Sequence, residues 1–142
     1  MPKIFEIADR YVESVAALNP VLATTLGVVG HDHEMTDYSP KSSAASAELD
    51  RDTIVELDAA PVGNERDRIA REVMLDALGL NLDLFDAREH LRSLSMIFSP
   101  IHSVRQSFDL MPRDTEEQWL NVASRMSLVR SGLESYQRTL DL

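Results

Sequence analysis

Cysteine does not occur in this sequence of 142 residues. Disulfide bonds and thiolate metal sites are therefore excluded, and the composition is typical of a cytoplasmic protein. Basic residues are also scarce, because 14 Lys and Arg stand against 24 Asp and Glu, which gives a net charge of -10. This balance argues against nucleic acid and against an anionic membrane surface as partners, since both require basic patches.

Long apolar runs are missing as well. No stretch reaches the roughly 18 apolar residues that a membrane-spanning helix requires. Acidic residues interrupt the first segment where a signal peptide would be apolar, at Glu6, Asp9 and Glu13. The length is that of one domain. We therefore expect residues 1–142 to form a single helical domain or the N-terminal fragment of a larger helical protein.

The apolar residues that are present recur with helical spacing, and no strand-like alternation is found. We therefore predict an all-α fold, an irregular helical bundle built around one long central helix. That helix should run from about Asn64 to Arg88. One apolar stripe along it steps by three and four residues: Ile69, Val73, Ala77, Leu80, Leu84 and Leu91. A second apolar set covers most of the remaining circumference: Met74, Leu75, Leu78, Leu82 and Phe85.

A helix that is apolar nearly all round is a buried one, so we expect neighbours on almost every side of this segment. Gly79 inside it should cost stability or allow a close helix crossing. The helix that follows Ser39-Pro40 has a thinner apolar stripe, which Asp50 interrupts, so we expect it at the surface. Ser99-Pro100 repeats the same start signal, a serine N-cap followed by proline in the first turn.

Three other segments complete the pattern. A first helix is predicted from about Pro2 to Leu18, and residues 27–38 show no period and predict a loop. Residues 114–117 have the pattern of a capping box that opens the last helix. Its apolar residues form a heptad-like seam from Trp119 to Leu140, with Gly132 as the weak point. Helix-on-helix docking at this seam, by self-association about a two-fold axis, is the partner arrangement that the pattern favours.

Two groups of polar residues are candidates for a functional site. His31-Asp32-His33 combines imidazoles and a carboxylate, but a zinc site needs three or four converging ligands, and the alternative is a solvated or partner-contacting loop. His102, Arg105 and Asp109 can share one helix face. They either form a polar cleft wall in which Arg105 binds a carboxylate, or contain only an Arg105–Asp109 pair within the helix.

We take His31, Asp32, His102, Arg105 and Asp109 as candidate cleft residues. No catalytic residue, cofactor site or metal site is predicted in this chain. A phosphate loop, a nucleophile elbow and a cysteine nucleophile are all absent from the sequence.

Short motifs follow one another in a characteristic order along the chain. They are Ala8-Asp9-Arg10-Tyr11, Asn19-Pro20, Leu26-Gly27, Gly30-His31-Asp32, Thr36-Asp37-Tyr38-Ser39-Pro40, Ser99-Pro100, Arg105, Phe108-Asp109-Leu110-Met111-Pro112, and Trp119 with Arg125. This ordered set resembles the N-terminal region of the bacterial "domain of unknown function 885" family.

The resemblance implies a part of a large, mostly helical, zincin-like protein with the character of a metallopeptidase. The zinc-binding segment of that family, a His-Glu pair with a further histidine, lies downstream of the matched region, so none of its ligands fall on this sequence. By fold-level analogy the chain would be a wall or lid of the substrate cleft, inactive alone. Its partner would be the C-terminal part or a second copy. The other hypothesis is a stand-alone helical protein–protein interaction module.

Overall fold

The computed structural model describes residues 3–142, and these consist of helices joined by turns and loops. No strand occurs in this range, which confirms the all-α class. No helix within the same range is long and apolar enough to cross a membrane. The elements in chain order are α1 (Lys3–Leu18), α2 (Pro20–Leu26), α3 (Pro40–Ala59), α4 (Glu65–Asp86), the 3-10 helix η1 (Glu89–Arg92), α5 (Pro100–Leu110) and α6 (Glu116–Leu140).

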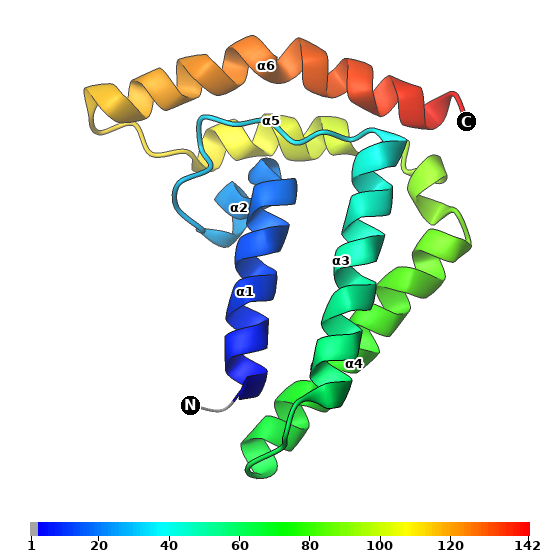
Figure 1. The fold of residues 1–142 in the computed structure, drawn as a ribbon. Coiled ribbons are helices and arrows are strands. Elements are labelled where there is room, and N and C mark those ends of the chain that lie inside the picture. The colour runs from blue at the N-terminus through cyan, green and yellow to red at the C-terminus, as the bar shows by residue number, and fades with distance from the viewer. Residues whose placement is uncertain (1–2) are drawn as a thin grey trace.

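The helices form two groups that differ in direction (Figure 1). The first group is α1, α3 and α4, in which α3 packs against both of the others. The second group is α5 and α6, which lie across one end of the first. Short α2 contacts both α1 and α5 and so connects the two groups. The result is an irregular bundle, as predicted.

The apolar core lies in the first group of helices. Its buried members are Ile4 and Ile7 on α1, Leu57 on α3 and Leu78 on α4. Helix α3 therefore packs on both α1 and α4, while its outer face, on which Val55 is 67% exposed, lies at the surface as predicted. The interruption at Asp50 is accommodated inside, because the Tyr11 hydroxyl donates a hydrogen bond of 2.8 Å to its Oδ1 atom. Burial raises the pKa of Tyr11, and the hydrogen bond to Asp50 raises it further.

Helix α4 begins and ends close to its predicted limits, but it is not buried on every side. It packs on α3 and α1 through the second apolar set, of which Leu78 is 3% exposed. No described helix covers its opposite face, and a Cβ on Gly79 would meet nothing within 4 Å, so no close crossing occurs there. The first stripe, predicted to be core, faces outward: Ile69 is 50% exposed, Val73 63%, Leu80 58% and Leu84 46%.

Capping side chains fix most helix starts. Asn19, Ser39 and Asn64 each accept a hydrogen bond from a backbone N–H in the first turn of the helix that follows. Thr115 and Gln118 form a capping box at the start of α6. These bonds confirm the predicted starts of α3 and α4, and the capping box of α6 lies within one residue of its predicted position.

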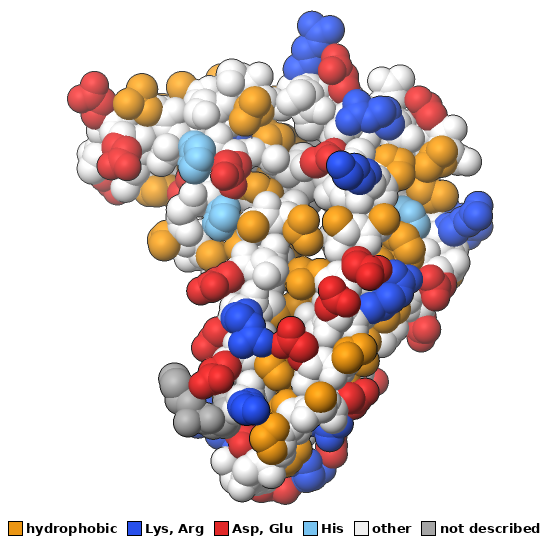
Figure 2. Space-filling view, in the orientation of Figure 1, with side chains coloured by type: hydrophobic (Ala, Val, Ile, Leu, Met, Phe, Trp, Pro, Cys, Tyr) orange, Lys and Arg blue, Asp and Glu red, His pale blue; other side chains and the backbone are white. Residues whose placement is uncertain are grey.

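Helix α6 turns a small and polar face inward, in contrast to the predicted apolar seam. Its buried residues include Arg125, Gly132, Ser135 and Thr139 beside two members of the seam, Val122 and Tyr136. Trp119 and Met126 of the seam are more than half exposed. The view in Figure 2 shows hydrophobic side chains scattered between charged ones over α3 and α6. The reason for the polar inner face is the loop that passes along α6.

Candidate functional site: a loop held by a buried arginine

The loop of residues 27–38 connects α2 to α3 and runs along the inner face of α6. Gly27 and Gly30 turn the chain with φ of 75° and 100°, values that favour glycine. Met35 lies directly against Gly132 of α6, where a Cβ atom would stand 2.8 Å from the Met35 Cγ. Gly132 therefore lets the loop approach the helix closely.

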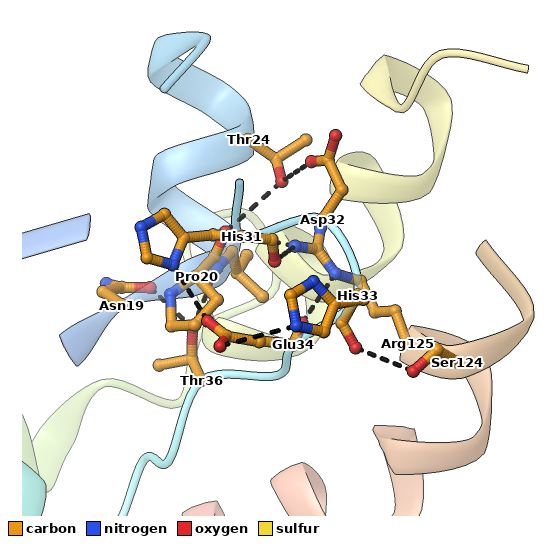
Figure 3. Close-up of polar contacts among 11 residues, drawn as sticks. Asn19, Pro20, Thr24, His31, Asp32, His33, Glu34, Thr36, Ser124 and Arg125 are labelled. Carbon is orange, nitrogen blue, oxygen red and sulfur yellow. Dashed lines mark hydrogen bonds and ion pairs between the residues drawn. The ribbon is translucent and has the colours of Figure 1, made fainter. Parts of the chain in front are cut away.

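Arg125 of α6 is fully buried, and its side chain binds backbone carbonyl oxygens of the loop (Figure 3). Its Nε donates to the carbonyl oxygen of Glu34 at 2.8 Å. Its Nη2 donates to the carbonyl oxygens of His31 at 2.9 Å and Pro20 at 3.2 Å. One side chain thus holds the start of α2 and two points of the loop. The remaining nitrogen, Nη1, is buried and has no hydrogen-bond partner among residues 3–142.

The surroundings of Arg125 change its pKa in opposite directions. Burial lowers its pKa, whereas the negative charges of Asp32 and Glu34 oppose that change. Because an arginine side chain starts with a pKa above about 12, it stays protonated and remains a donor only. Bonds from a charged donor to backbone carbonyls are stronger than neutral ones. Arg125 is therefore built to fix the path of the loop.

Side-chain hydrogen bonds also tie the loop to α2. The Thr24 hydroxyl donates to Asp32 Oδ1 at 2.7 Å. The Thr36 hydroxyl donates to Asn19 Oδ1 at 2.7 Å and accepts from the Val21 N–H at 3.0 Å. Asp32 thus connects the loop to α2 through one of its carboxylate oxygens.

On the other side, hydroxyl groups of α6 hold the loop backbone. Ser124 donates to the carbonyl oxygen of His33 at 3.0 Å, and Thr139 donates to that of Tyr38 at 2.6 Å. The Tyr38 N–H donates to the Ser135 hydroxyl at 2.8 Å. The inner face of α6 is polar because these groups satisfy the backbone of a partly buried loop, which would otherwise be costly.

The end of the loop prepares the start of α3. Asp37 accepts hydrogen bonds of 2.9 Å from both the N–H and the hydroxyl of Ser39. Partial burial raises the pKa of Asp37, but the bonds from Ser39, with Ser135 and Arg138 nearby, outweigh it and lower the pKa. Burial raises the pKa of Tyr38, and the neighbouring Thr36 hydroxyl and the Arg125 charge oppose this only in part.

The two loop histidines share one carboxylate. His31 Nδ1 lies 2.9 Å from Glu34 Oε2, and His33 Nε2 lies 3.7 Å from Glu34 Oε1. Asp32 points to Thr24 and does not join them. Between residues 3 and 142, no group of three or more His, Cys, Asp and Glu side chains is arranged to hold a metal ion.

The five candidate cleft residues lie on two different elements. His31 and Asp32 belong to the loop, whereas His102, Arg105 and Asp109 belong to α5. Arg105 and Asp109 form the ion pair expected from their spacing, at 3.4 Å and largely exposed. His102 lines a cavity between α2 and α5 that neither His31 nor Asp32 reaches. A shared cleft role for the five residues stays a prediction.

Arg125 is the residue of this site that sequence patterns did not single out. It lies beside the apolar seam of α6, where an arginine normally reaches solvent. The only signal for it was its place at the end of the ordered motifs that resemble a known family. Its partners are backbone carbonyls, which carry no sequence pattern of their own.

The fold and this site define an all-α protein in which a buried arginine holds a loop between two helices. The chain matches the family of bacterial proteins of unknown function, DUF885, over residues 20–142, and it belongs to that family. The matched range includes the loop, Arg125 and both helices that hold the loop. A comparison with curated proteins finds no match.

Proposed function

We propose that this chain is a helical wall or lid that packs against further helices of a larger protein, in the zincin-like, metallopeptidase-like arrangement that the family resemblance implies. In this proposal the chain supplies part of a substrate cleft and no metal ligand. Alone it neither binds zinc at a defined site nor hydrolyses peptides. A cytoplasmic location belongs to the same proposal and is supported by the lack of cysteine.

The outward apolar row of α4 is the observation that carries the proposal. Ile69, Val73, Leu80 and Leu84 follow one helix face, and each is at least 46% exposed. Rows of apolar residues at this spacing normally face other helices. Contiguous apolar patches on a protein surface mark contact sites.

The total exposed area supports the same conclusion. The chain of 15.9 kDa exposes 9100 Å². A compact monomer of this mass exposes roughly 7,400 Å², so the excess is about 1,700 Å². A standard protein–protein interface covers only roughly 800 Å² on each partner. The excess is thus large enough for the extended packing of one part of a fold on another.

The charges beside the apolar row indicate the chemistry of the partner. The arginines of α4 lie around Ile69 at its start, and Arg68 pairs with Glu72 there. Beside Val73, Leu80 and Leu84, the charged residues without an ion pair among residues 3–142 are the acidic Asp76 and Asp83, and α4 contains no Lys or Arg beyond Arg71. A covering helix should therefore present apolar residues flanked by Lys or Arg. This requirement separates the proposed contact from nonspecific apolar adhesion.

The test begins with the codons that follow Leu142. We expect an open reading frame that encodes a His-Glu pair and a further histidine. Expressed as a separate polypeptide, that part should bind this chain in calorimetry, and only the mixture with zinc should hydrolyse peptides. The double variant Val73→Asp, Leu80→Asp should weaken the association at least about tenfold, because it places charge in an apolar contact.

The matched control is Val55→Asp, a single exposed valine on α3 that is 67% exposed. It should leave the association unchanged. A reading frame without the histidine segment, or two parts that do not associate, would contradict the proposal.

The alternative, a stand-alone interaction module that self-associates, is favoured by the outer face of α6. Met126, Val129 and Leu133 line a shallow groove of about 610 Å³ there. The helix starts with Glu116 and Glu117 and has Arg138 in its last turn, so an antiparallel pair of copies would place opposite charges near each other. Light scattering tests it: a dimer mass that Met126→Glu converts to a monomer supports this module. A monomer that binds no hydrophobic dye argues against both functions.

A further inference from the structure

A groove of about 320 Å³ lies between α3 and the C-terminal part of α4. Its apolar wall consists of Ala47 on α3 and of Leu84 and Phe85 on α4, and His90, whose ring stacks on Phe85 at 4.7 Å between centroids, also lines it. Among residues 3–142, no Lys or Arg lines the groove. Leu84 is also the last member of the outward apolar row of α4 and is 46% exposed, so the groove adjoins the surface that a covering helix would contact.

Asp50 of α3 supplies a buried carboxylate to this groove. The residue is 7% exposed, and its Oδ1 atom accepts the hydrogen bond from Tyr11. The other oxygen, Oδ2, accepts no hydrogen bond within the described part of the chain, and it is not one of the enclosed polar atoms without a partner, so solvent reaches it. The adjacent Arg51 pairs with Glu48 and Asp86 instead. Because a buried charge without an opposite charge is costly, this carboxylate points to a cationic ligand.

The other polar groups of the groove are arranged as hydrogen-bond acceptors. The hydroxyls of Ser43 and Ser46 donate to the carbonyl oxygens of Ser39 and Ser42, at 3.4 and 3.2 Å. Their protons are thus engaged within α3, and their oxygens offer lone pairs to the groove. Asn81 of α4 adds an amide oxygen. A ligand that only donates hydrogen bonds suits this set.

We propose that the groove binds a primary ammonium group at the end of an alkyl chain, supplied by a lysine of the segment that covers α4. Ser43, Ser46 and Asp50 follow one another at steps of three and four residues, so they share one face of α3. The ammonium group has three donors, and it donates to Asp50 Oδ2 and to the serine oxygens. Its methylene stem contacts the apolar wall of the groove. The source of the lysine rests on the proposed function, whereas the ammonium site does not.

Two other cations fit the groove less well. A guanidinium binds a carboxylate best through two parallel hydrogen bonds, which need both oxygens, and Tyr11 already occupies Asp50 Oδ1. A divalent metal ion needs several charged ligands, and no group of three or more His, Cys, Asp and Glu side chains in residues 3–142 is arranged to hold one. The acceptor set therefore favours lysine over arginine and over a metal ion.

The ligand test is an NMR titration of the whole chain with N-acetyllysine methylamide, a model of a lysine within a peptide. Salt of about 0.15 M keeps the Debye length near 8 Å and screens the general attraction of an acidic protein for cations. Saturable shifts of the Asp50 amide and the Asn81 side-chain amide signals are expected. The norleucine analogue, which lacks the ammonium group, and the arginine analogue should each bind at least about tenfold more weakly. Equal binding of the lysine compound and either analogue, or no saturable shift, would overturn the proposal.

A charge-removing variant locates the site. Asp50→Asn keeps an oxygen for the Tyr11 hydroxyl but removes the negative charge, and it should weaken binding of the lysine compound at least about tenfold. Asp52→Asn removes the same charge from an exposed part of α3 outside the groove and should leave binding unchanged. Wild-type affinity in Asp50→Asn would overturn the assignment.

A charge-adding variant tests the groove without altering the buried carboxylate. Ser46→Lys places an ammonium group of the chain itself one helix turn from Asp50 and should abolish binding of the lysine compound. Ala45→Lys adds the same charge at an exposed neighbouring position that does not line the groove, and it should leave binding unchanged. Wild-type affinity in Ser46→Lys, or an equal loss in both variants, would contradict the proposed site.

Calorimetry with the polypeptide encoded after Leu142 separates this inference from the proposed function. If that part binds the chain and Asp50→Asn weakens the association about tenfold, the lysine comes from that part. If it binds wild type and Asp50→Asn equally, the lysine assignment is overturned while the covering of α4 stands. If the two parts do not associate, the proposed function fails, and the titration with the lysine compound alone decides whether the groove is an ammonium site.

Discussion

Two regions of the molecule are held together by different forces. The first region is formed by α1, α3 and α4, and the second by α2, the 27–38 loop and α6. In the first, apolar side chains such as Leu57 and Leu78 pack on one another. In the second, Arg125 and the hydroxyl groups of α6 bind individual backbone carbonyls. Apolar packing is non-directional, whereas hydrogen bonds are directional. The second region therefore fixes the path of a loop that has little apolar side-chain area to bury.

Loss of the buried charge should produce the largest effect. Arg125→Met keeps much of the side-chain volume but removes the charged donor from the carbonyls of Glu34, His31 and Pro20. The carbonyls of Pro20 and His31 keep bonds from the Thr24 hydroxyl and the Glu34 N–H. We expect the free energy of unfolding to fall by about 4 kcal/mol, because three hydrogen bonds from a charged donor are lost. Urea unfolding followed by circular dichroism measures the change.

Arg130→Met is the matched control, because the Arg130 side chain is 89% exposed and pairs with Glu134. Its effect should stay within about 0.5 kcal/mol. If the two variants are equally stable, Arg125 does not hold the second region together.

A cavity in the apolar region should cost somewhat less. Leu57 is completely buried, and Leu57→Ala should lower the free energy of unfolding by about 3 kcal/mol. Hydrogen exchange should then accelerate first at amides of α1 and α4, whereas Arg125→Met should accelerate it first in the loop. The same pattern of exchange in both variants would show that the two regions open as one unit. Val55→Ala, at an exposed position on α3, should change neither measurement.

The two helical glycines give a smaller contrast. Gly79→Ala should stabilise the protein by about 1 kcal/mol, because alanine favours helix and its Cβ would meet nothing within 4 Å. Gly132→Ala should lose this gain, because its Cβ would press on Met35 at 2.8 Å. Thermal unfolding of the two variants compares them directly. An equal rise in both midpoints would show that the loop does not lie tightly on α6.

The smallest effect expected depends on pH. The folded protein lowers the pKa of Asp37, so this carboxylate stabilises the fold above its unfolded pKa of about 4. That contribution is lost as the pH falls through the lower, folded pKa. Asp37→Asn should thus be less stable than the wild type near neutral pH, by under about 1 kcal/mol, because the group is largely exposed.

The difference for Asp37→Asn should vanish in acid, and urea unfolding over a pH series follows it. Asp52→Asn, on an exposed part of α3, serves as the control. A stability difference for Asp37→Asn that grows as the pH falls would have the wrong sign for this explanation.

Helix limits could be predicted well because their signals are local. Ser39-Pro40, Asn64 and Thr115 each act on the first turn of the helix that follows them, whatever the rest of the chain does. Burial could not be predicted in the same way. Helix α4 has two apolar faces, and which of them meets α3 depends on the neighbours. The stripe containing Val73 looked like core and is the one that stays exposed.

The loop site could be predicted only in outline. The two glycines and the absence of a period indicated a loop at residues 27–38, and the histidine cluster lies in it. The role of Arg125 could not be inferred, because its partners are main-chain oxygens 91, 94 and 105 residues away. Hydrophobic periodicity relates positions within one helix, so it cannot indicate a contact between segments this far apart in the sequence.

The distance along the chain between Arg125 and Pro20 also sets an order of events during synthesis. Their contact spans 105 residues, so α2 and the loop leave the ribosome long before α6 exists. At about 5–20 residues per second, the interval is roughly 5–20 seconds. Helices α1, α3 and α4 can collapse in that time, while the carbonyls of the loop remain hydrated by water. We expect the nascent chain to be cut by proteases at the loop until the last helix arrives.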